Sequence, residues 1–153
     1  MTFFEELKER ILILDGAMGT MLQRHGLAGN SETFTLTHPD VIGSIHDEYI
    51  AAGADIIETN TFSANRISQA EYGMQENAAR MALEGARIAR AAADAASRKV
   101  WVAGSVGPTG KSLTLAQNIS DPAYRQYSFD DMASAFEEQI RALIEGGVDA
   151  ILL

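Results

Sequence analysis

The sequence contains no cysteine. These residues can therefore supply neither a disulfide framework nor a thiolate metal site. They also contain no apolar run that approaches the ~20 residues of a membrane-spanning helix. The stretch MTFFEELKERILILDG carries charges between its apolar residues, unlike a secretory signal peptide. We therefore expect a cytoplasmic protein with no disulfides and no membrane partner.

Basic residues are scarce relative to acidic ones. The chain has 12 Lys and Arg against 21 Asp and Glu, which gives a formal net charge of −9 at pH 7. Such a field repels nucleic-acid backbones and anionic membrane surfaces, so nucleic acid is not expected as a partner. The 153 residues, 46% of them hydrophobic, are sufficient for one domain with a sizeable core.

Apolar runs alternate with helical patterns along the chain. The runs are ILILDGAMGT from Ile11, ADIIETNTF from Ala54, VWVAGSVGPTG from Val100 and DAILL from Asp149. This alternation predicts four parallel strands in βα units, the first of them a buried strand that ends at Asp15. Such units form either a doubly wound sheet or a (β/α)8 barrel. In both architectures, ligands bind beyond the carboxyl ends of the strands.

Helices are expected before and between these runs. The expected helices cover Phe3–Arg10, a segment from Pro39 to Gly53, Gln75–Ser97 and a segment from Ser128 to Gly146. Ser128 and Asp131 resemble a capping box at the start of the last helix. The patterns AGADII from Ala52 and GGVDAI from Gly146 match at two helix-to-strand junctions, which indicates one structural device used twice.

Candidate binding residues follow the first run. Asp15 is succeeded by a loop composed of Gly16, Ala17, Met18, Gly19 and Thr20. The small side chains in this loop would let backbone N–H groups face a small anion such as a carboxylate. The alternative is an ordinary Asp-Gly turn.

Polar residues also follow the second run. Glu58 would be a second acid at a neighbouring strand end. The alternative is a rim carboxylate held by backbone donors or by a base such as Arg66. Asn60 and Thr61 are interpreted as short-range polar contacts rather than catalytic groups.

The segment Gly104–Ser112, GSVGPTGKS, invites comparison with a phosphate-binding P-loop. The spacing fails, because Ser105 stands where the pattern needs glycine. Thr114–Pro122 also looks irregular where a P-loop needs a helix to start at once. A nucleotide-binding domain is therefore the less favoured alternative.

The histidines give no metal motif. His25, His38 and His46 lack the spacing of a metal site and are interpreted as solvated or capping side chains.

Several runs together resemble a known family. They are ILILDGAMGTML, LTHPDVIGSIHDEYIAAGADIIETNTFSANR, VAGSVGPTGKS, SDPAYRQYSFDDM and EGGVDAILL. In this order they are similar to the homocysteine-binding module of cobalamin-dependent methionine synthase. The segment from Asp121 to Asp131 favours the cobalamin-dependent branch over betaine-dependent or reductase-fused homocysteine methyltransferases.

The resemblance implies a (β/α)8 barrel of the TIM type, of which residues 1–153 would be the N-terminal half with roughly the first four β/α units. It implies a zinc ion that is held by three cysteines of the other half and coordinates the homocysteine thiolate, and a methyl group delivered by cobalamin. Cobalamin and methyltetrahydrofolate would bind to other modules of a longer chain.

The resemblance also assigns the binding residues. Asp15 and Gly16–Thr20 match the rim that contacts the amino-acid end of homocysteine. The second and third rim segments contain Glu58, Asn60, Thr61, Ser105 and Gly107. No catalytic residue and no metal ligand is assigned within this chain.

These assignments lead to two expectations about residues 1–153. Alone they should bind no zinc at the family site and transfer no methyl group, because they contain no cysteine. A four-strand piece would also leave open strand edges and an apolar face, so we expect self-association. A fold fragment that binds no ligand is a third hypothesis.

Overall fold

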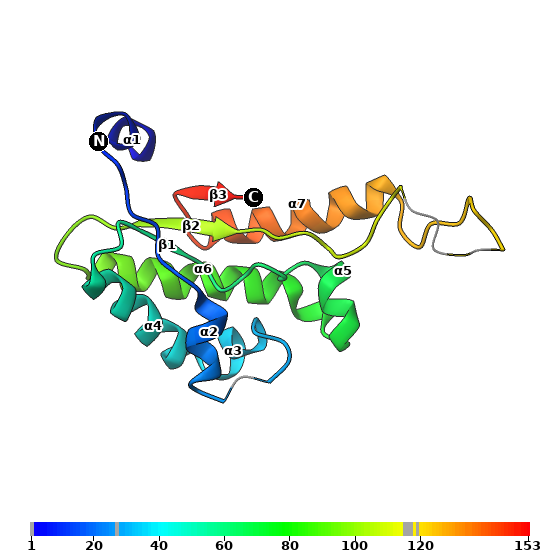
Figure 1. The fold of residues 1–153 in the computed structure, drawn as a ribbon, viewed down its shortest axis with the longest axis horizontal. Helices are drawn as coiled ribbons and strands as arrows, with labels where there is room; N and C mark the ends of the chain where they lie inside the picture. The colour runs from blue at the N-terminus through cyan, green and yellow to red at the C-terminus, as the bar shows by residue number, and fades with distance from the viewer. Residues whose placement is uncertain (1, 27, 115–117, 119) are drawn as a thin grey trace.

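The computed structural model describes residues 2–26, 28–114, 118 and 120–153. Within them, a three-stranded parallel sheet is flanked by helices (Figure 1). The strands are β1 (Ile56–Glu58), β2 (Trp101–Ser105) and β3 (Ala150–Leu152). The α-helices are α1 (Phe3–Glu9), α2 (Met18–Gln23), α3 (Thr33–Thr37), α4 (Pro39–Ala52), α5 (Arg66–Gln69), α6 (Ala78–Ala95) and α7 (Phe129–Glu145), with short 3-10 helices η1 (Ala70–Tyr72) and η2 (Gln75–Asn77).

The sheet confirms parallel strands for the second, third and fourth apolar runs. The strand order is β1-β2-β3, with Ile56 opposite Trp101 and Ala103 opposite Ala150. Because all the strands point the same way, their carboxyl ends share one edge of the sheet. In the described part of the chain the sheet does not close into a barrel.

The prediction of a buried first strand is wrong. The segment Ile11–Asp15 forms only one parallel bridge, Leu14 to Ile56, and the side chains of Ile11 and Ile13 are 86% and 56% exposed. It nevertheless runs beside β1, because the N–H of Ile56 donates to the carbonyl of Ile13 (3.0 Å) and the N–H of Asp15 to that of Ile56 (2.9 Å). The segment is thus an open edge whose outer side is uncovered, and the apolar composition alone did not reveal this.

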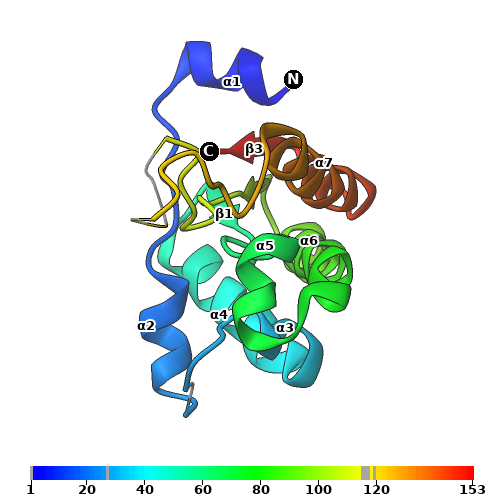
Figure 2. The same cartoon turned by 90° about the vertical axis from the view of Figure 1, so that its right-hand side faces the viewer.

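The two faces of the sheet are covered differently. Ile57 and Val102 point toward the helices and pack with the alanines of α6, whereas Ile56 and Trp101 lie on the opposite face with Phe3 of α1. Figure 2 shows α6 and α7 on one side of the strands and α1 on the other. The small side chains of α6 permit a close crossing with α7, where a Cβ on Gly146 would collide with that of Ala86. The alanine-rich composition therefore serves tight helix packing.

The repeated junction pattern corresponds to a repeated clamp. The carboxylate of Asp55 accepts the N–H of Ile13 (3.0 Å) and pairs with Arg10 (3.0 Å), which lowers the pKa of this carboxyl group. The carboxylate of Asp149 likewise accepts the N–H of Val102 (2.8 Å) and pairs with Arg90 (2.8 Å). Each aspartate ties the start of its strand to the backbone of the preceding segment. The first clamp holds the register of the segment that ends at Asp15.

The residues that were predicted to begin and end α4 and to cap α7 do so in the structure. Pro39 opens α4, and Gly53 closes it with φ of 108°. Both hydrogen bonds of the capping box between Ser128 and Asp131 are present. The helix α3 was not predicted. Among the described residues, no helix combines the length and the apolar composition needed to cross a membrane.

Candidate functional site

A cavity of about 440 Å³ lies at the carboxyl ends of β1 and β2. Most of the predicted site residues line it. From that prediction come Asp15, Gly16, Ala17, Met18, Gly19, Glu58, Asn60, Thr61 and Ser105, and the wall is completed by Ser31, Glu32, Thr59 and Phe62. The arrangement follows from the parallel sheet, which brings segments distant in sequence to one edge. None of these lining residues is Lys, Arg or His.

Asp15 is the central acid of this cavity. One carboxylate oxygen accepts the N–H of Glu58 (3.0 Å), and the other, Oδ1, is buried without a hydrogen-bond partner among the described residues. Burial raises the pKa of Asp15 to about 7, the hydrogen bond from Glu58 opposes the rise, and the charge of Glu58 adds to it. A carboxyl group with a free acceptor and a pKa near neutrality is suited to receive a cationic or proton-donating group of a ligand.

Glu58 lies next to Asp15 at the end of β1. Its carboxylate accepts the hydroxyl of Ser105 at 3.1 Å. The proposed alternative partner is wrong, since Arg66 pairs with Glu138 (3.0 Å) and with Glu76 (3.9 Å). Glu58 therefore accepts a hydrogen bond from a neutral donor, forms no salt bridge with a described residue, and lines the cavity.

Asn60 and Thr61 connect the walls of the cavity through hydrogen bonds. The amide of Asn60 donates to the carbonyl of Ser31 (2.9 Å) and to the hydroxyl of Thr35 (3.1 Å). The hydroxyl of Thr61 donates to the carbonyl of Ser105 (2.8 Å). These bonds fix the rim segments relative to one another.

Two predicted residues, Thr20 and Gly107, lie outside the cavity lining. Met18, Gly19 and Thr20 form the first turn of α2 rather than a loop, and Thr20 is exposed. Gly107 lies beneath the ring of Phe62, where a Cβ would come within 2.5 Å of the ring carbons. Its role is thus to let Phe62 pack closely.

Sequence reasoning missed the contribution of residues 31 and 32. They lie in a short connection before α3 that has no periodic pattern and follows no predicted strand. Only the folded chain brings this connection to the strand ends. Thr59 and Phe62 belong to the rim segment after β1, but no local sequence pattern identified them as residues that line the cavity.

The P-loop alternative finds no support in the structure. Residues 106–114 contain no helix, and the amino group of Lys111 pairs with Glu71 at 2.7 Å. The part of the predicted irregular segment at 115–117 and 119 lies outside the described residues.

One histidine interpretation is wrong. His25 and His38 are exposed, but His46 is 0% exposed in the core. No group of three or more His, Cys, Asp or Glu side chains that could hold a metal ion occurs among the residues whose positions are described.

Comparison with known proteins gives a consistent result. Residues 12–153 match the family model described as homocysteine S-methyltransferase. Crystal structures of the homocysteine methyltransferase MmuM from Escherichia coli are also similar. The oxidized form has 27% identity and a TM-score of 0.76 over 95% of this chain and 53% of that chain. The apo form has 27% identity and a TM-score of 0.63 over 95% and 49%.

The metallated form of MmuM supports the same fold. It has 23% identity and a TM-score of 0.73 over 96% of this chain and 55% of that chain. This chain thus spans about half the length of the solved structures that it matches.

Proposed function

The chain belongs to the homocysteine S-methyltransferase family, and from this we propose that it forms the homocysteine-binding part of a methionine synthase. In this proposal, the complete enzyme transfers a methyl group from methylcobalamin to the homocysteine sulfur and gives methionine. The observation that carries the proposal is the cavity at the carboxyl ends of β1 and β2, lined by Asp15 and its neighbours.

The chemistry of the cavity supports an amino-acid ligand. Asp15, Glu32 and Glu58 offer carboxylates to an α-ammonium group, and the described residues that line the cavity include no Lys, Arg or His to compete with it. The exposed backbone at Gly16 and Ala17 can face the carboxylate of the ligand. A volume of about 440 Å³ is sufficient for an amino acid of this size.

The family implies a zinc ion, which the residues of this chain do not fit. The sequence has no cysteine, and the described side chains form no group suited to a metal. We therefore propose that zinc ligands come from residues other than these. This chain would bind and orient the substrate only.

The architecture proposed for the complete domain is a (β/α)8 barrel, with residues 1–153 as its N-terminal half. The support is the parallel order β1-β2-β3, the segment Ile11–Asp15 beside β1, and a match to about half of each MmuM chain. A barrel would place further strands beside both open edges.

The methyl donor proposed for the complete enzyme is methylcobalamin. The segment from Asp121 to Asp131 resembles the cobalamin-dependent branch, in which a cobalamin-binding module would be the partner and methyltetrahydrofolate the source of the methyl group. Betaine-type or reductase-fused homocysteine methyltransferases are the alternatives.

Homocysteine should stabilise this chain against thermal unfolding. A ligand that binds only the folded state at one hundred times its Kd adds ~2.7 kcal/mol, which would raise the melting temperature by several degrees. The measurement is a thermal melt with homocysteine, with ATP as the control for a P-loop. Stabilisation by ATP and not by homocysteine would overturn the proposal. The same sample should form no methionine, because the proposed zinc ligands are absent from it.

Self-association is expected from the open edges of the sheet. Ile11 is 86% exposed and Leu14 41% exposed beside β1, and Leu152 of β3 is 39% exposed at the other edge. Unpaired edges with apolar side chains favour pairing with another chain. Light scattering should show a mass that rises with concentration. The double substitution Ile11→Lys and Ile13→Lys should shift the distribution toward monomer, and a wild-type chain that stays monomeric at high concentration would contradict the expectation.

A further inference from the structure

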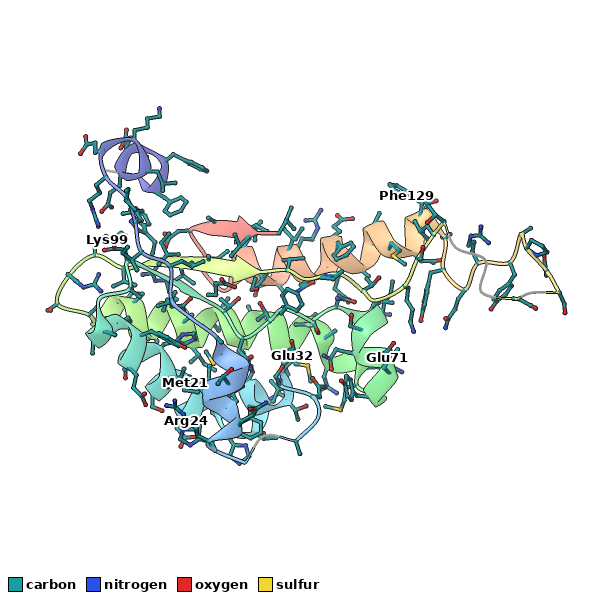
Figure 3. All side chains as sticks on the ribbon, in the orientation of Figure 1. Met21, Arg24, Glu32, Glu71, Lys99 and Phe129 are labelled. Carbon is teal, nitrogen blue, oxygen red and sulfur yellow. The ribbon has the colours of Figure 1, made fainter. Side chains whose placement is uncertain are left out.

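Glu32 is a buried acid with no basic partner among the described residues. It is 3% exposed, and it is one of the residues that line the cavity. One oxygen accepts the N–H of Ser63 at 2.7 Å, and the other accepts the hydroxyl of Ser31 at 2.9 Å. No Lys, Arg or His of the described chain forms a salt bridge with it. In the view of Figure 3, Glu32 is labelled between the ribbons of α2 and α5.

This arrangement is costly for a purely structural residue. A carboxylate removed from water requires a counter-charge or several strong hydrogen bonds, and Glu32 has two neutral donors. The acids nearby, Asp15 and Glu58, add negative charge to the same cavity. The missing positive charge can enter from the cavity that Glu32 lines.

Glu32 is also held in place. Its neighbour Ser31 accepts the amide of Asn60 (2.9 Å), and Asn30 donates to the side chain of Gln69 (2.6 Å). Gln69 is 0% exposed and donates to the carbonyl of Ser63 at 3.0 Å. The connection that carries Glu32 is thus fastened to the rim after β1 at several points. The carboxylate cannot turn out to solvent without breaking its own hydrogen bonds from Ser63 and Ser31, so its position in the wall of the cavity is fixed before a ligand arrives.

We propose that Glu32 is a specificity-determining residue of the cavity, which recognises the ammonium group of the amino-acid substrate together with Asp15. This inference rests on the proposed function for the identity of the substrate. It assigns to Glu32 the rejection of thiols that lack an amine.

The test combines one substitution with ligands that differ by one group. Glu32→Gln removes the charge and keeps both contacts, because the amide oxygen can accept from Ser63 and the amide N–H can donate to Ser31. Calorimetry on the chain would compare homocysteine with 4-mercaptobutyrate, which lacks the amine, and 3-mercaptopropylamine, which lacks the carboxylate. Glu48→Gln on the exposed surface of α4 makes the same change in net charge and serves as the control.

The expected result is a loss that depends on the ligand. Glu32→Gln should weaken the binding of homocysteine and 3-mercaptopropylamine by roughly tenfold or more, and change the binding of 4-mercaptobutyrate by less than about twofold. Glu48→Gln should change none of them.

Each other outcome has a distinct meaning. Equal losses for all ligands would show that Glu32 only holds the wall, and no loss for the amines would show that it does not face them, so both would overturn the inference. If the wild-type chain bound 3-mercaptopropylamine but not homocysteine, the proposed function would fail. The amine would still report the role of Glu32. A wild-type chain that bound neither amine would overturn both.

Discussion

Replacement of Asp15 by asparagine should weaken homocysteine binding by about ten- to one-hundredfold at pH 8. The substitution keeps the shape of the side chain and removes the charge that would face the ammonium group. A charged hydrogen bond in a partly buried site contributes ~1.5–3 kcal/mol, which corresponds to this range. Isothermal titration calorimetry measures the effect directly. Asp47→Asn, on the exposed face of α4, makes the same change in net charge away from the cavity.

The pH dependence of binding tests the same residue without relying on a single affinity. Burial raises the pKa of Asp15 to about 7, so the carboxyl group holds a proton in a large fraction of the free chains at pH 6. An ammonium group favours the ionised form, and binding therefore releases this proton. The affinity should rise by up to about tenfold per pH unit below pH 7 and level off above it.

Proton release can be counted by titration in two buffers of different ionisation enthalpy. Asp15→Asn should abolish the release and flatten the pH profile, whereas Asp47→Asn should leave both unchanged. If the wild-type profile were flat between pH 6 and 8, Asp15 would not be the group that meets the ammonium ion.

Replacement of His46 by leucine should protect the fold against acid. His46 is 0% exposed, and neither ring nitrogen has a hydrogen-bond partner among the described residues. Burial lowers the pKa of His46 to about 4. The unfolded chain therefore takes up a proton near pH 6.5, while the folded chain does so only near pH 4. Protonation favours unfolding, and stability due to this residue is lost as the pH falls from about 7 toward 4.

The size of this loss is on the order of 3 kcal/mol, since each unit of pKa difference corresponds to ~1.4 kcal/mol. Asp15 has the opposite sign. Its folded pKa lies above that of the unfolded chain, so its contribution falls as the pH rises from about 4 to 7, by ~2 kcal/mol after allowance for partial exposure. The two slopes oppose each other in the wild-type chain.

Urea unfolding at a series of pH values separates the two residues. The His46→Leu variant should keep the Asp15 slope and lose stability toward neutral pH, whereas Asp15→Asn should keep the His46 slope and lose stability toward acid. His25→Gln removes an exposed histidine and is the control for histidine content. An unchanged acid loss in His46→Leu would mean that other groups govern acid unfolding.

Much of the candidate site was predictable because strand ends are local features. The carboxyl ends of the runs at Glu58 and Ser105 could be read from the point where apolar residues give way to polar ones. Parallel strands then bring such ends to one edge, and the structure places both side chains in contact at 3.1 Å. The match to a family model is also a property of the sequence.

The residues that were misjudged depend on contacts between distant segments. Arg66 was offered as a partner for Glu58, but the packing of α5 against α7 places it beside Glu138. Glu32 has no local pattern and reaches the cavity because hydrogen bonds from Asn60 and Ser63 fasten its connection to the rim.

The sequence by itself determined the strands β1, β2 and β3, the long helices α4, α6 and α7, the helix boundaries at Pro39, Gly53 and Ser128, and the family. These follow from periodicity, backbone preference and hydrogen bonds within a few residues, all of which are set by neighbours in the chain. The tertiary structure alone decided that Ile11 is exposed, that His46 is buried without partners among the described residues, and that Glu32 joins Asp15 in one cavity. The burial of a side chain and its proximity to other charged groups depend on which distant segments pack together, and no local sequence pattern encodes that packing.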